Sequence, residues 1–75
     1  MFARWPGEPP PAPREEVVVV RPGYVHTHGY YRWHRGHYAW VRGHYVRERP
    51  GWVWRDGAWQ SRDGHWEYRR GGWHR

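Results

Sequence analysis

Aromatic and polar residues alternate along most of the chain after residue 23. In residues 31–34 and 52–55, every second position carries a tryptophan or a tyrosine, and arginine, histidine or valine fills the positions between. Successive side chains of a β-strand point to opposite faces, so this alternation predicts strands with one aromatic face and one polar face. We therefore expect an all-β fold.

The pattern repeats every 14 residues through four copies. Tyr24, Tyr38, Trp52 and Trp66 form one of the series with this spacing. A longer period of 28 residues is superimposed, because the Arg-Pro-Gly of residues 21–23 recurs at 49–51. A fixed period indicates repeated supersecondary units. The four units span approximately residues 21–34, 35–48, 49–62 and 63–75.

Pairs of the form x-Gly interrupt the alternation. Two-residue hairpin turns favour glycine, because they need positive φ angles. The predicted turn glycines are Gly29, Gly36, Gly43, Gly57, Gly64 and Gly71. The sequence thus predicts an antiparallel meander of about eight short strands, built from four 14-residue hairpin repeats. The strands are expected at approximately 24–27, 30–34, 37–41, 44–47, 52–55, 58–62, 65–69 and 72–75.

Pairing residues across these turns gives two aromatic rows on one face of the sheet. The pairs expected in this way include His26–Tyr31, Tyr31–Trp40, Trp40–Tyr45 and Trp54–Trp59. The aromatic face contains Tyr24, Tyr31, Trp33, Tyr38, Trp40, Tyr45, Trp52, Trp54, Trp59, Trp66, Tyr68 and Trp73. Arg47 and Arg75 lie in the same rows and are candidate contacts for an anionic ligand. The rows run straight, whereas a closed barrel needs a staggered register, so we expect an open sheet with free edges.

Residues 1–16 differ from the rest, because they contain five of the seven prolines. This composition predicts an extended, Pro-rich tether, followed by an aromatic β-repeat domain at residues 17–75. The longest apolar run, residues 17–20, is far shorter than the ~20 residues of a membrane span. The tether also lacks the apolar stretch of a signal peptide.

The net charge of +6 comes from 13 arginines, and seven histidines add to it in mild acid. Anionic partners fit this charge, and so does a compositional bias toward arginine that serves only solubility. The chain contains no cysteine and no lysine. Disulfides, thiolate metal sites and Schiff-base chemistry are therefore excluded.

No set of residues typical of an active site is present. The acidic residues are scattered over the tether, the turns and the polar face. Apart from tyrosines, Ser61 and Thr27 are the hydroxyl candidates for a nucleophile, and no histidine is expected beside Ser61 to act as its base. We expect neither enzymatic activity nor a cofactor.

His34 and His37 flank one predicted turn and are the candidate metal ligands. Cross-strand neighbours lie about 5 Å apart at Cβ, close enough for two imidazoles to share Zn²⁺, Ni²⁺ or Cu²⁺. His28 and His44 are further candidates from neighbouring turns. The alternative is that these histidines are solvated surface residues, since a stable zinc site normally has four ligands.

Two segments carry a resemblance to a known family. Residues 51–59 (GWVWRDGAW) and 38–45 (YAWVRGHY) resemble the units of the bacterial WXXGXW repeat family, also written YXWGXW. The resemblance covers residues 21–75, with departures at His26 and Gly72. It implies a small periplasmic, outer-envelope or extracellular protein with a Pro-rich spacer before the repeats. It implies no particular activity.

These features predict a structural protein that forms homo-oligomeric sheets or filaments through its sheet edges or its aromatic face. An open sheet has unpaired edges, to which another chain can add. The alternative is a binding module whose tryptophans, tyrosines and arginines bind a glycan or another surface. Polysaccharide is the favoured ligand of such a module, and nucleic acid the less favoured one.

Overall fold

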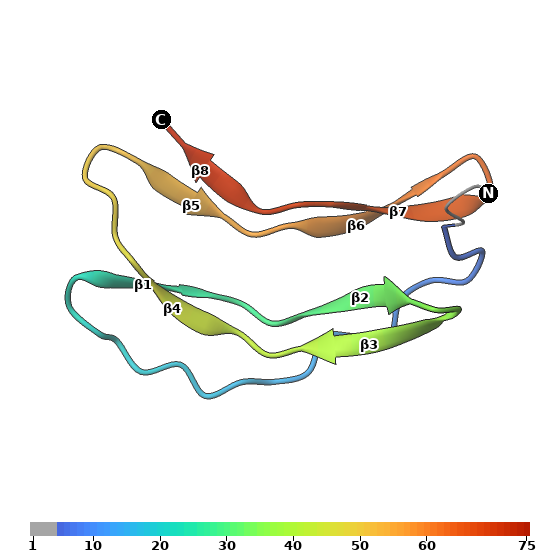
Figure 1. The fold of residues 1–75 in the computed structure, drawn as a ribbon, viewed down its shortest axis with the longest axis horizontal. Coiled ribbons are helices and arrows are strands. Elements are labelled where there is room, and N and C mark those ends of the chain that lie inside the picture. The colour runs from blue at the N-terminus through green and yellow to red at the C-terminus, as the bar shows by residue number, and fades with distance from the viewer. Residues whose placement is uncertain (1–4) are drawn as a thin grey trace.

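The computed structural model describes residues 5–75, which form strands and contain no helix (Figure 1). The eight strands begin and end at or next to their predicted positions. They are β1 (Tyr24–Thr27), β2 (Tyr30–His34), β3 (His37–Val41), β4 (His44–Arg47), β5 (Val53–Arg55), β6 (Ala58–Arg62), β7 (His65–Arg69) and β8 (Gly72–His74). The predicted class, an all-β fold of short antiparallel strands with clustered aromatic residues, is confirmed.

The strands pair in an order that differs from a meander of four short hairpins. β1 pairs with β4 and β2 with β3, while β5 pairs with β8 and β6 with β7. The register runs on unchanged from one ladder to the next, since Thr27 lies opposite His44 and Tyr30 opposite Val41. Residues 24–47 therefore form one long hairpin, the first hairpin, and residues 53–74 form the second hairpin.

The turns explain this difference. Arg35 and Gly36 have φ angles of 48° and 82°, and Asp63 and Gly64 have 49° and 81°, as a type I′ hairpin turn requires. The other predicted turn glycines have no positive φ, and the chain passes through them without reversing. The prediction of hairpin turns at Gly29, Gly43, Gly57 and Gly71 is corrected accordingly, and we call these four positions the glycine breaks.

The cross-strand pairs change with the topology. Pairs beside the two type I′ turns agree with prediction and include Tyr31–Trp40, Trp33–Tyr38, His34–His37, Trp59–Tyr68 and Ser61–Trp66. The pairs expected across the glycine breaks were wrong, because no turn exists there. In their place the structure has His26–Tyr45 and Trp54–Trp73.

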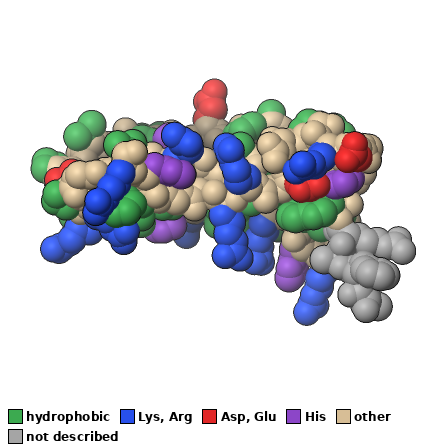
Figure 2. Space-filling model, turned by 90° about the horizontal axis from the view of Figure 1, so that it is seen from above, with side chains coloured by type: hydrophobic (Ala, Val, Ile, Leu, Met, Phe, Trp, Pro, Cys, Tyr) green, Lys and Arg blue, Asp and Glu red, His purple; other side chains and the backbone are tan. Residues whose placement is uncertain are grey.

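The molecule consists of three layers, measuring 42 × 27 × 20 Å (Figure 1). Residues 5–21, which we call the strap, contain no helix or strand. The strap begins at the turn end of the second hairpin, where Pro6 accepts a hydrogen bond from the amide of Trp66, and then runs beside the first hairpin on the side away from the second. Aromatic side chains are half-buried between the layers, and among the described residues only Pro6 and Thr27 are buried. Figure 2 shows arginine side chains projecting along the whole length of the molecule.

Candidate functional site

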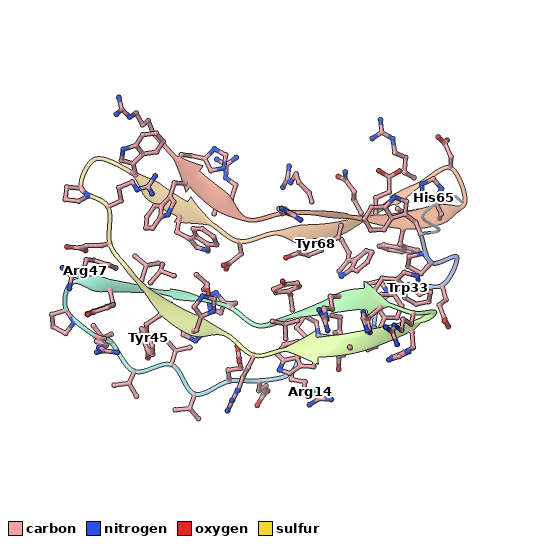
Figure 3. The ribbon with its side chains drawn as sticks, in the orientation of Figure 1. Arg14, Trp33, Tyr45, Arg47, His65 and Tyr68 are labelled. Carbon is pink, nitrogen blue, oxygen red and sulfur yellow. The ribbon has the colours of Figure 1, made fainter. Side chains whose placement is uncertain are left out.

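The strap packs on the aromatic face of the first hairpin. The Arg14 guanidinium lies 5.7 Å from the ring centre of Trp40, within the range of a cation–π contact. The hydroxyl of Tyr45 donates a hydrogen bond to the carbonyl of Val19 at 2.6 Å. Figure 3 shows Arg14 and Tyr45 on the strap side of the first hairpin. Through Arg14 and Val19, the strap therefore lies against the repeat domain.

The carboxylate of Glu16 joins the strap to both arms of the first hairpin. It accepts hydrogen bonds from the backbone amides of Gly29 at 2.7 Å and Gly43 at 2.8 Å. Hydrogen bonds to an ionised acceptor are about twice as strong as neutral ones. The bonds from Gly43 and Gly29, in that order, hold the pKa of Glu16 below its usual value.

Glycine is required at these breaks because other groups come so close. A Cβ atom on Gly43 would lie 2.5 Å from the Thr27 carbonyl and 2.7 Å from Cε1 of His26. One on Gly29 would meet the Trp40 ring and lie 2.8 Å from the Val41 carbonyl. Real Cβ atoms essentially never approach other heavy atoms below 3.0 Å. The close approach of the opposite strand and of neighbouring rings therefore requires glycine at these positions, and in the first hairpin the amides of the two glycines also meet the Glu16 carboxylate.

The 28-residue period extends back into the strap, a signal that the sequence reasoning did not use. Before the Arg-Pro-Gly that begins at Arg21, the residue pairs that show it are Arg14 and Arg42, and Val18 and Val46. The strap and β4 are each followed by a turn that contains a glycine with positive φ, 83° at Gly23 and 81° at Gly51. The strap therefore precedes the first hairpin in the same way that β4 precedes the second. Extending the 28-residue period into the strap predicts that the strap, including Glu16, packs on the first hairpin.

The aromatic face of the second hairpin packs against the first hairpin. Tyr68 stacks on Tyr30, with ring centres 4.9 Å apart and 13° between the planes. The indole of Trp59 donates to the carbonyl of Tyr31 at 2.7 Å, and its ring centre is 5.4 Å from that of Tyr38. Tyr68 lies between the two hairpins (Figure 3), where burial raises its pKa to about 12.

Asp56 links the two hairpins beside this stack. Its carboxylate lies 2.6 Å from Nδ1 of His28 and accepts a hydrogen bond from the indole of Trp54 at 2.7 Å. Partial burial acts to raise the pKa of Asp56, but the hydrogen bonds from Trp54 and His28 outweigh it and lower the pKa. Next to Asp56 is a cavity of about 320 Å³, with Gly57 and Gly71 among its lining residues.

The two arginines predicted to contact anions lie over aromatic rings. The Arg75 guanidinium is 4.4 Å from the ring centre of Trp52, and that of Arg47 is 6.0 Å from the ring centre of Tyr24. Arg49, which was not singled out in the sequence, lies between Trp52 and Trp73 at 5.6 and 5.3 Å. These cations are held at the open end of each hairpin, and their contact with an anionic ligand stays a prediction.

His34 and His37 face each other across the first type I′ turn, as predicted, with ring centres 6.2 Å apart. Among residues 5–75, no three histidine, cysteine or acidic side chains come together in a group that could hold a metal ion. His28 and His44, the further candidates, instead contact Asp56 and Thr27. His34 and His37 therefore offer two ligands to a metal ion, and their binding of one stays a prediction.

The described part of the chain has no helix of the length and apolarity that crossing a membrane requires. The resemblance of the repeat units to the WXXGXW family stays a prediction. No family model, curated protein or solved structure matches this chain.

Proposed function

We propose that this protein is a non-enzymatic structural component that assembles with copies of itself through sheet edges. The observation that carries the proposal is that all four sheets have only two strands. Every strand therefore has one edge whose amides and carbonyls are not paired with another strand. Two-stranded sheets are marginally stable alone, and unpaired edges are templates for another chain.

Residues 17–20 are the edge best suited to accept a second copy. They form an extended run of four valines, and the exposed fractions of Val17, Val19 and Val20 are 93%, 67% and 89%. Within the described chain, this segment is not part of any ladder and is held through the hydroxyl of Tyr45, which bonds the backbone of Val19. Exposed β-branched residues without charge or proline are typical of edge-to-edge pairing.

The family resemblance supports a location in the bacterial envelope or outside the cell. There, a sheet that adds copies edge to edge forms an extended layer or filament, because identical head-to-tail contacts stay open unless a rotation closes them into a ring. We expect an extended oligomer in preference to a closed dimer.

Light scattering after size exclusion, together with negative-stain imaging, tests the assembly. The double variant Val17→Lys/Val20→Lys places two charges on the proposed edge without touching a buried group. It should abolish the oligomers and retain the circular dichroism of the parent. Val53→Lys is the matched control, because Val53 is also exposed, at 68%, and lies away from residues 17–20. A folded wild-type monomer at tens of micromolar would contradict the proposal.

A second candidate function is glycan binding at the open end of the second hairpin. Trp52 and Trp73 lie there with Arg49 and Arg75 over their rings, whereas the strap contacts the second hairpin at its turn end, through Trp5 and Pro6. Tryptophan and arginine side by side suit the faces and acidic groups of a polysaccharide. An acidic polysaccharide should protect tryptophan fluorescence from quenching by acrylamide, and this protection should be lost in Trp52→Ala. That result would favour glycan binding over assembly.

A further inference from the structure

The glycine breaks of the two hairpins match in sequence but differ in what lies against them. Gly57 and Gly71 stand 28 residues after Gly29 and Gly43. The amides of the earlier pair both donate to the Glu16 carboxylate. Among the residues that the structure describes, no side chain accepts a hydrogen bond from the amides of the later pair. The 320 Å³ cavity lies against both of those glycines.

The residue in the place of Glu16 explains the difference. His44 stands 28 residues after Glu16 and lines the cavity. Its Nδ1 is 3.1 Å from the hydroxyl of Thr27, so one side of the ring is engaged within the first hairpin. An imidazole has no negative charge to offer, and the second pair of amides lacks the acceptor that the first pair has.

The other groups around the cavity favour an anion. Two arginines, Arg42 and Arg70, belong to the lining. The single carboxylate of the lining, that of Asp56, is already engaged by His28 and Trp54. Arginine, imidazole and backbone amides are the donors that proteins use to hold carboxylates.

We propose that this cavity binds a carboxylate group, held by the amides of Gly57 and Gly71 as Glu16 is held in the first hairpin, and neutralised by Arg42 and Arg70. The volume is at the low end of the ~300–1,000 Å³ of small-ligand sites, which suits a small organic acid such as a hexuronate. The same chemistry is offered by a glutamate side chain of a second copy. This binding site is independent of assembly through residues 17–20.

Nuclear magnetic resonance of the full chain, labelled with ¹⁵N-glycine, tests the proposal directly. Sodium glucuronate is titrated against sodium chloride at equal ionic strength. We expect saturable shifts of the Gly57 and Gly71 amides, with Gly29 and Gly43 unmoved because Glu16 already occupies them. Dilution of the Val17→Lys/Val20→Lys variant without glucuronate separates the two sources, since assembly through residues 17–20 is then absent and only a carboxylate from a second copy makes the two shifts depend on protein concentration. If neither glucuronate nor dilution moves these amides, or if all four move alike, the proposal is overturned.

Three variants locate the site. Arg42→Gln should weaken glucuronate binding at least tenfold, whereas Arg69→Gln, an exposed arginine outside the lining, should leave it unchanged. His44→Glu places a carboxylate at the position that matches Glu16. It should shift the Gly57 and Gly71 amides without ligand and remove their response to glucuronate. An undiminished response in His44→Glu, or equal effects of the two arginine variants, would refute the site.

Discussion

Trp59 is the side chain whose removal best tests how the two hairpins are joined. Its indole donates to the Tyr31 carbonyl at 2.7 Å, and its ring contacts Tyr38, Tyr68 and Trp5 with ring centres 5.4, 5.3 and 5.8 Å away. Trp59→Phe keeps an aromatic ring and removes the donor. The partly buried Tyr31 carbonyl then has no partner, which costs about 1–3 kcal/mol.

Trp59→Ala removes the ring contacts as well. Aromatic pairs add about 0.5–1.5 kcal/mol each beyond their burial, and replacing a large buried aromatic by alanine costs about 3–5 kcal/mol. Trp59 is half-buried, so we expect a loss near the lower end of that range. In a domain of this size, a loss of 1 kcal/mol lowers the melting temperature by roughly 4–8 °C.

Urea unfolding followed by far-ultraviolet circular dichroism measures these losses, in the Val17→Lys/Val20→Lys background so that assembly does not contribute. Trp66 provides the matched control, because it lies opposite Ser61 in the same sheet and not opposite another aromatic residue. Trp66→Phe should cost less than half as much as Trp59→Phe. Equal losses for the two substitutions would refute the hairpin interface described above.

Four further predictions follow from the pairing, the titrating groups and the histidine pair. A double-mutant cycle on Trp54 and Trp73, whose ring centres are 5.5 Å apart, should give a coupling of about 0.5–1.5 kcal/mol, and a cycle on Trp54 and Trp59 should give none; the reverse result would restore the meander. The pKa of Glu16 is lowered in the folded chain, so its stabilising effect is complete above the ordinary pKa of 4.5 that it has when unfolded, and is lost as the pH falls through the folded pKa. Glu16→Gln should abolish this acid-dependent loosening of the strap, measured by hydrogen exchange at Gly29 and Gly43, whereas Glu15→Gln should leave it intact. The pKa of Tyr68 is raised to about 12 from its ordinary value of 10.0, so the free energy of unfolding should fall as the pH rises between these values. Tyr68→Phe should flatten the decline in alkaline urea titrations. Calorimetry should show micromolar Cu²⁺ or Zn²⁺ binding that His37→Ala removes, and binding unchanged by that substitution would assign His34 and His37 to the solvated surface.

The positions of the strands could be predicted because alternation is a local property. Their pairing could not, because the same dipeptide does two different things. Arg35-Gly36 reverses the chain and Arg42-Gly43 does not, although both are Arg-Gly. Asp63-Gly64 and Asp56-Gly57 differ in the same way. The conformation of each pair depends on what packs against it, which the two residues alone do not encode.

The anion contact of Glu16 was missed for a related reason. An acidic residue in a Pro-rich segment has the composition of a solvated tether. Its partners are two backbone amides, 13 and 27 residues away, and amides carry no side-chain signature. The one trace in the sequence is the 28-residue period, which continues to Arg14, seven residues before the Arg-Pro-Gly at which the repeat was taken to begin.

Because the repeat period matches one hairpin, we expect the number of stacked hairpins to follow the number of 28-residue copies in the sequence. Each 28-residue copy forms one hairpin, and the two hairpins share arginine, turn and aromatic positions. Inserting one further copy of residues 21–48 after residue 48 should therefore add a third hairpin to the stack, and not produce a new fold. In this arrangement, tandem duplication is a conservative change, and a single-residue insertion within a copy is a drastic one.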